Sequence, residues 1–235
     1  MMNTQNKREI LRFERLPSTN DHAKSLRGEK KNLTVVAKEQ TGGRGTKGRS
    51  FSSEKGGLYV SVLTFYESLP ARNAFSIMAR AATSICKTLE KFGITPKIKW
   101  PNDIYVSDKK ICGILIENTF SGALIDNSVV GIGINVNNRL PEELLSIATT
   151  AKDVLRKELD LSELEKELFK ALEAPFFMGE YTSRLGYLGV PVRLFVGEKT
   201  LSAIPCGVTE KGELIATVDG EKRTFPSAEV SLRIE

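Results

Sequence analysis

Residues 33–66 read LTVVAKEQTGGRGTKGRSFSSEKGGLYVSVLTFY, and this stretch decides the class of fold. Residues 33–38 and 58–66 are rich in β-branched and aromatic residues, which predicts two strands. Between them, residues 41–57 hold six of the 19 glycines and four cations against one carboxylate. A strand rather than a helix follows this loop, so it is a poor dinucleotide-binding fingerprint, and its spacing is not that of Walker A.

Outward from this stretch, the chain alternates strands and helices. Ahead of it we expect an edge strand at 7–16 and a helix that Ser18 or Thr19 caps and Gly28 ends. After it, the spacing of apolar residues predicts a helix over 71–92 that Gly93 ends, a strand over 97–100, a hairpin of 104–106 and 110–117, and a strand over 128–136. Residues 141–173 are predicted to form two helices that are broken near 160–162. Ser162 and Glu165 fit a capping box at the start of the second helix.

The pattern changes after Gly186, where short strands are bounded by glycine and charged residues. This spacing predicts a small antiparallel barrel of about 50 residues. We therefore expect an α+β protein with two domains, residues 1–186 and 187–235. The length of 235 residues suits one large domain with a small one.

Composition excludes several classes of protein. Apolar residues make up 40% and charged residues 27%, as in ordinary globular proteins. No apolar run approaches the roughly 18 residues of a membrane helix, and the charged N-terminus does not resemble a secretory signal. Three scattered cysteines argue against a disulfide framework or a CxxC metal site and favour a reducing cytoplasm. With His22 as the lone histidine, a histidine-rich metal site is excluded and a histidine-based triad is unfavourable.

The net charge of +5 suits contact with nucleic acid, an acidic protein or an anionic small molecule, and charge alone does not choose among them. Residues 40–49 interleave glycines with Arg44, Lys47 and Arg49. Glycines expose backbone N–H groups and the cations supply positive charge, so the segment can surround a phosphate. A flexible surface loop is the equally weighted alternative.

Three further segments can carry chemistry. After Lys99-Trp100-Pro101, a turn presents Asn102 and Asp103. Asp103 can bind Mg²⁺ or orient an attacking amine. The alternative is an Asx turn that only satisfies backbone donors. Lys109 and Lys110 lead into an apolar strand that contains Gly113. One of the two lysines faces a carboxylate or phosphate at the mouth of a pocket, or, as the alternative, both lysines are solvated. Gly131 and Gly133 share one strand face, where a flat ligand or a packed helix can lie.

Together these segments resemble biotin protein ligases. The resemblance is carried by an ordered set of motifs: S-T-N at 18–20, Q-x-x-G-R-G-x-x-G-R at 40–49, K-W-P-N-D at 99–103, K-x-x-G-I-L at 110–115 and G-I-G-I-N at 131–135. It implies a mixed sheet with helices, like class II aminoacyl-tRNA synthetases, plus a C-terminal SH3-like barrel. It also implies ATP-dependent formation of biotinyl-5′-AMP and transfer of biotin to a lysine.

The resemblance assigns roles to individual residues. Those implied to bind biotin are Ser18, Thr19, Asn20, Gln40, Gly43, Arg44, Gly45, Thr46, Lys110, Gly113, Gly131 and Gly133. Those implied to bind ATP are Arg44, Arg49, Phe51, Lys99, Asn102 and Asn135. Arg44, Lys110 and Asp103 are the implied catalytic residues, with Asp103 also a candidate Mg²⁺ ligand. Thr46 stands where the family often has arginine, and Phe51 where it often has tryptophan.

The implied substrates are biotin, ATP and Mg²⁺, without a tightly bound prosthetic group. The implied partner is a biotin carboxyl carrier protein of acetyl-CoA carboxylase or a related carboxylase. The chain begins almost at the catalytic motifs, so we expect a ligase without a DNA-binding domain and without a membrane partner. Family members are monomers or homodimers, which leaves a homodimer open. A lipoate–protein ligase and a non-enzymatic nucleic-acid-binding module are the alternative functions.

Overall fold

The computed structural model of the chain describes residues 8–227 and 230–234. Its contacts divide the chain into two compact units, each made of two separate stretches of sequence. Unit 1 comprises residues 1–71 and 113–161, and unit 2 comprises residues 72–112 and 162–235. One strand, β6 (Lys109–Ser121), begins in unit 2 and continues in unit 1.

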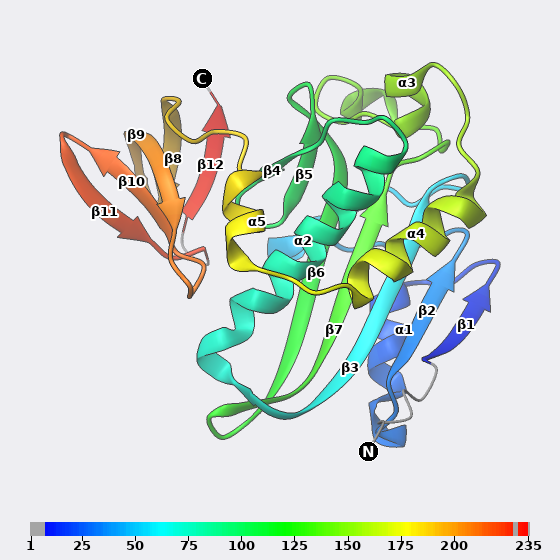
Figure 1. The fold of residues 1–235 in the computed structure, drawn as a ribbon. Coiled ribbons are helices and arrows are strands. Elements are labelled where there is room, and N and C mark those ends of the chain that lie inside the picture. The colour runs from blue at the N-terminus through cyan, green and yellow to red at the C-terminus, as the bar shows by residue number, and fades with distance from the viewer. Residues whose placement is uncertain (1–7, 228–229, 235) are drawn as a thin grey trace. The chain divides into compact units, whose positions relative to one another are not determined.

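Unit 1 is built on a mixed β-sheet. Its strands lie in the order β1 (Glu9–Phe13), β2 (Leu33–Ala37), β3 (Leu58–Pro70), β7 (Leu124–Ile134) and β6. β1 is parallel to β2, whereas β2 and β3, and β3 and β7, are antiparallel. The glycine-rich loop therefore joins two neighbouring strands (Figure 1), which confirms the strand–loop–strand prediction.

Helix α1 (Thr19–Ser25) packs on β2, β3 and β7. Ser18 is its N-cap, as predicted, and the Ser18 hydroxyl accepts a hydrogen bond from the Asp21 backbone N–H at 3.3 Å. The helix ends earlier than Gly28 because a 3₁₀ turn, η1 (Arg27–Glu29), replaces its last predicted turn. Apolar side chains from helix and sheet form the core between them: Ala23, Leu33, Val35, Leu63 and Val129.

Unit 2 contains α2 (Ala74–Lys91), which packs on α5 (Met178–Ser183), β4 (Lys97–Lys99) and β5 (Asp103–Val106). The predicted helix over 71–92 is confirmed from residue 74, and Gly93 ends it with a φ of +81°. The predicted hairpin is β5 and the start of β6. Its turn residues, Ser107 and Asp108, both have positive φ, as a tight hairpin requires.

The C-terminal part of unit 2 is a five-stranded antiparallel sheet, which confirms the predicted small β-structure. Its strand order is β11-β10-β9-β8-β12. The strands are β8 (Val192–Val196), β9 (Lys199–Val208), β10 (Leu214–Val218), β11 (Glu221–Phe225) and β12 (Val230–Ile234). The buried core of this sheet also takes in Trp100 from the Lys-Trp-Pro-Asn-Asp motif. The domain boundary at residues 186 and 187 stays a prediction.

The prediction of two helices over 141–173 is wrong for its first half. The chain there forms η4 (Glu142–Leu144) and a short α3 (Ala151–Leu155) before α4 (Leu161–Glu173). Asn137 makes two side-chain hydrogen bonds to the backbone of Leu159, which hold the approach to α4 as a loop. Because α4 already begins at Leu161, Ser162 lies inside the helix, and the capping-box prediction is also wrong.

Among the residues that the structure describes, no helix combines the length and the apolar character needed to cross a membrane.

Candidate active site

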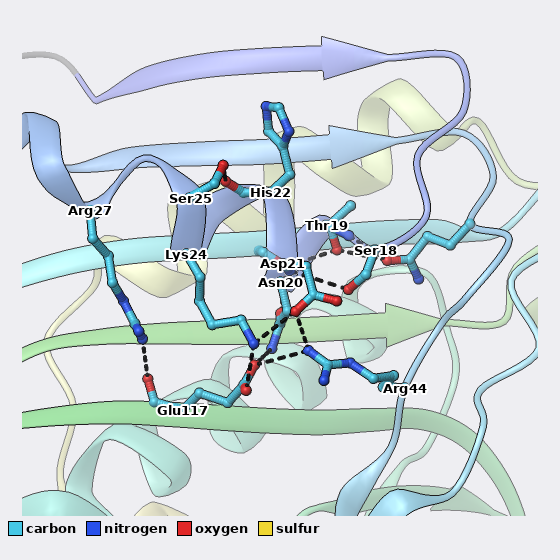
Figure 2. A network of polar contacts seen from close by, with 12 residues as sticks. Ser18, Thr19, Asn20, Asp21, His22, Lys24, Ser25, Arg27, Arg44 and Glu117 are labelled. Carbon is cyan, nitrogen blue, oxygen red and sulfur yellow. Dashed lines mark hydrogen bonds and ion pairs between the residues drawn. The ribbon is translucent and has the colours of Figure 1, made fainter.

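The Ser-Thr-Asn segment is presented by the first turn of α1. Because Ser18 caps the helix, Thr19 and Asn20 begin it, and all three side chains are buried. Buried polar groups are costly unless they are hydrogen-bonded. Thr19 and Asn20 are both bonded, to partners on β3, on β6 and in the glycine-rich loop (Figure 2).

Gln40 ties this helix to the glycine-rich loop. Its Oε1 accepts hydrogen bonds from the Thr19 backbone N–H at 2.8 Å and the Thr19 hydroxyl at 2.9 Å. Its Nε2 donates to Ser53 Oγ at 2.9 Å. A Cβ at Gly43 would lie 2.4 Å from the carbonyl oxygen of Phe51, so the loop closes around Gln40 only with glycine at that position.

The glycines of β7 make room for two side chains of the same unit. A Cβ at Gly131 would lie 2.2 Å from Asn20 Oδ1, and one at Gly133 would lie 2.6 Å from the ring of Phe51. The two glycines share one face of the strand, as their alternation predicts. Asn20 and the Phe51 ring therefore lie against the face that was predicted to receive either a flat ligand or a packed element.

Arg44 belongs to a cluster of alternating charges between α1, β6 and the loop (Figure 2). Its guanidinium forms an ion pair with Asp21, and its NH2 lies 3.7 Å from Glu117 Oε2. Lys24 bridges the same two carboxylates, at 2.7 Å from Asp21 and 2.8 Å from Glu117. Two acids and two cations are thus paired with one another, and Glu117 joins them to Asn20. We call these four residues the charge cluster.

The charge cluster keeps its half-buried members ionised. Burial acts to raise the pKa of Glu117, but hydrogen bonds from Lys24 and Asn20 and the charges of Lys24 and Arg44 outweigh it, so this pKa lies below its usual value. Burial acts to lower the pKa of Lys24, and its hydrogen bonds to Asp21 and Glu117 raise it instead. At neutral pH, Glu117 is a carboxylate and Lys24 an ammonium.

The rest of the glycine-rich loop forms a tight, exposed turn. The Gly45 N–H donates to the Arg49 carbonyl at 2.6 Å, and residues Thr46–Gly48 form the 3₁₀ turn η2 between them. Arg49 Nε reaches the Thr46 carbonyl at 3.4 Å, and both Arg44 and Arg49 are exposed. Two cations of the loop are therefore open to an anionic ligand.

A second group of predicted site residues lies in unit 2. Lys110 Nζ is 2.7 Å from Asp103 Oδ1, although this buried oxygen lacks a well-aligned hydrogen bond. Across the β4–β5 pairing, Lys99 lies over the ring of Tyr105 at 4.8 Å and donates to its hydroxyl at 3.3 Å. Asn102 precedes β5 and is partly buried. The hairpin and its neighbouring strand therefore gather two lysines and a carboxylate.

Aromatic side chains hold the turn that presents Asn102 and Asp103. The Trp100 indole is buried and donates to the carbonyl oxygen of Gly212 at 3.0 Å. The buried Tyr181 hydroxyl donates to the carbonyl oxygen of Pro101 at 2.9 Å. Trp100 therefore packs in the core of unit 2, which leaves the residues after it to carry the chemistry of the motif.

Two predicted residues lie elsewhere. Gly113 lies on β6, the strand that carries Lys110. Asn135 is buried at the end of β7, where its Oδ1 accepts from Asn138 Nδ2 at 3.4 Å.

Among residues 8–227 and 230–234, no three histidine, cysteine or acidic side chains gather to hold a metal ion. Asp103 is therefore a single carboxylate, and Mg²⁺ there would need most of its oxygen ligands from a substrate.

The structure thus brings most predicted biotin residues together in unit 1, and places Lys99, Asn102, Asp103 and Lys110 in unit 2. Sequence reasoning missed Glu117 as the residue that bonds Asn20. The available signal was the position of Glu117, a carboxylate at the end of the apolar segment that follows Lys110.

Comparisons with known proteins agree with this geometry. Residues 12–135 match the Biotin/lipoate A/B protein ligase family. The chain is 31% identical to the bifunctional ligase/repressor BirA of Escherichia coli, over 93% of this chain and 72% of that protein. It is 26% identical to the biotin–[acetyl-CoA-carboxylase] ligase of Paracoccus denitrificans, over 92% and 97%. The biotin protein ligase of Aquifex aeolicus in complex with biotin and ATP superposes with a TM-score of 0.77, at 32% identity, covering 97% of this chain and 99% of that one.

Proposed function

This chain belongs to the Biotin/lipoate A/B protein ligase family, and from that membership we propose how its residues carry out biotin transfer. The chain is an ATP-dependent biotin ligase. Biotin's carboxylate attacks the α-phosphorus of ATP, which gives biotinyl-5′-AMP and releases pyrophosphate. The amine of an acceptor lysine then attacks the acyl carbon, an amide forms, and AMP leaves. Neither step needs a nucleophile from the enzyme.

The observation that carries the assignment of the biotin site is the buried network of Thr19, Asn20 and Gln40 beside the exposed Arg44. The network offers fixed polar groups, which suit the ureido end of biotin and its surroundings. Gly113, Gly131 and Gly133 would line the wall for the ring system, with Ser18, Gly43, Gly45 and Thr46 around it. Arg44 would face the carboxylate and the α-phosphate.

The nucleotide and the reacting atoms need cations, because negative charge accumulates on the phosphoryl oxygens as biotin attacks. We assign Lys110 to these oxygens and Asp103 to the approaching lysine amine. Arg49, Lys99, Asn102 and Asn135 are assigned to the nucleotide, and the Phe51 ring to stacking on adenine. Mg²⁺ would enter with the phosphates of ATP, and Asp103 is the carboxylate assigned to it.

The acceptor we propose is a lysine on the biotin carboxyl carrier protein of acetyl-CoA carboxylase or a related carboxylase. We place the reaction in the cytoplasm, because the three cysteines are scattered along the chain and no disulfide joins them. The assembly we propose is a monomer or a homodimer without specific DNA binding.

The direct test is to incubate the purified chain with Mg²⁺-ATP and either biotin or lipoate, and to measure released pyrophosphate. We expect pyrophosphate with biotin, and a mass increase of one biotinyl group on an added carrier domain. Release with lipoate and not with biotin would assign the chain to the lipoate branch of the family.

Arg44→Ala is expected to speed the escape of preformed biotinyl-5′-AMP by about 10- to 100-fold, because a charge-assisted hydrogen bond is worth about 1.5–3 kcal/mol. The measurement is the dissociation rate of labelled adenylate after a chase with unlabelled ligand. Arg15→Ala is the matched control, since Arg15 is an exposed arginine paired with Glu39 outside the site. An unchanged rate for Arg44→Ala would remove Arg44 from the adenylate site.

A further inference from the structure

Glu117 occupies a central place in unit 1 that the proposed function leaves without a role. Its carboxylate accepts from Asn20 Nδ2 at 2.9 Å and from Lys24 Nζ at 2.8 Å, with Arg44 at 3.7 Å. Its backbone carbonyl accepts from Arg27 at 3.1 Å. These three neighbours of the side chain are all donors, and the side chain is 30% exposed, so the contacts are partly shielded from water.

An ionised carboxylate is the group that suits this position. A carboxylate only accepts hydrogen bonds, whereas a glutamine of the same shape would turn an NH₂ group toward one of the donors. The donor opposite that NH₂ group would lose its partner, and a half-buried donor without a partner costs about 1–3 kcal/mol. Charge, and not shape alone, is therefore what Glu117 contributes to its neighbours.

Glu117 also decides which way the Asn20 amide points. With Nδ2 held by Glu117, Oδ1 faces the Ser61 hydroxyl at 2.6 Å and lies over Gly131. If the Asn20 amide were flipped, its Oδ1 would lie next to the Glu117 carboxylate, and two acceptor oxygens would face each other without a hydrogen between them. Ser61 Oγ also lies 2.8 Å from the Thr19 hydroxyl, which bonds Gln40, so the Asn20 amide adjoins the polar groups assigned to biotin.

Asp21 provides a natural contrast within the charge cluster. It pairs with the same two cations, Lys24 and Arg44, but half of its side chain is exposed, and the Asn20 side chain bonds Glu117 and Ser61 instead. Exposed ion pairs contribute little, about 0–1 kcal/mol. Removing either acid deletes one negative charge from the cluster, yet only Glu117 touches Asn20.

We propose that Glu117 is a positioning residue for biotin, which acts by fixing the Asn20 amide in the orientation that receives the ligand. The inference rests on the proposed function, in which Asn20 lies at the biotin site. Asn20 is assigned to the binding of biotin and not to the reacting carboxylate. Its misplacement therefore weakens the binding of biotin equally in the ground state and in the transition state. Such a loss raises KM and leaves kcat nearly unchanged.

The experiment compares Glu117→Gln with Asp21→Asn in biotin-dependent pyrophosphate release. We expect Glu117→Gln to raise KM for biotin about tenfold or more, with kcat changed less than about threefold. Asp21→Asn should change KM less than about threefold. In the Asn20→Ala background, adding Glu117→Gln should have little further effect, because the two side chains act as one unit.

Three results would overturn the inference: a KM for Glu117→Gln within twofold of the native value, equal effects of the two acid variants, or full additivity with Asn20→Ala. Glu117→Asp keeps the charge with a shorter reach and should give an intermediate KM. It serves in place of Glu117→Gln if that variant does not fold, and a native KM for it would then count against the proposal. A native chain that releases no pyrophosphate with biotin would instead overturn the proposed function.

Discussion

Lys110→Ala is expected to slow formation of biotinyl-5′-AMP by about 10²–10³-fold. The ammonium of Lys110 is assigned to the phosphoryl oxygens that gain charge as the carboxylate attacks, and removing one such fixed donor typically costs a factor of this size. Its partner Asp103 lies 2.7 Å away, which holds the lysine in place before the substrates arrive. The measurement is single-turnover pyrophosphate release at saturating ATP and biotin.

The adjacent lysine supplies the matched control. Lys109→Ala removes the same charge from the same strand, but successive side chains on a strand point to opposite faces, so we expect near-native rates. Lys110→Ala should cost about 1–3 kcal/mol of stability, because it leaves the buried Asp103 Oδ1 without its partner. Equal rates for the two variants, with both folded, would remove Lys110 from the mechanism.

Trp100→Ala is expected to lower the free energy of unfolding by about 3–5 kcal/mol. The indole is 3% exposed and lies among the buried apolar residues of the C-terminal sheet, so its removal leaves a large cavity. It also strips the Gly212 carbonyl of its donor. The measurement is the midpoint of urea-induced unfolding, followed by far-ultraviolet circular dichroism.

Trp100→Phe separates the two causes. The phenyl ring keeps most of the buried volume and loses the N–H donor, so we expect a smaller loss of about 1–2 kcal/mol. If Trp100 instead faced a ligand, Trp100→Ala would leave the unfolding midpoint unchanged and would weaken substrate binding. That outcome would contradict the packing of Trp100 against the C-terminal sheet.

Local signals predicted the elements that carry most of the site. The β-branched runs at 33–38 and 58–66 became β2 and β3, and Ser18 caps α1 as its hydroxyl and position predict. The turn at Ser107 and Asp108 joins β5 to β6. Each of these features depends on a few neighbouring residues, so the sequence was enough to find them.

The segment at 141–173 shows where such signals fail. Its charged and apolar residues have helical spacing, but Asn137 bonds to the backbone of Leu159 and holds the chain before α4 as a loop. Side-chain hydrogen bonds to distant backbone compete with the helix, and spacing does not report them. The helix therefore starts at Leu161, which also displaces the predicted capping box.

The motifs by themselves determined the family, the strand–loop–strand unit and the candidate residues Thr19, Gln40 and Arg44. Tertiary structure alone decided that Trp100 packs against the C-terminal sheet and that Glu117, 97 residues from Asn20 in the sequence, accepts a hydrogen bond from its side chain. The physical reason is that hydrophobic period and capping are properties of adjacent residues. Which carboxylate meets which amide depends instead on how strands and helices pack, and that appears only when the chain is folded.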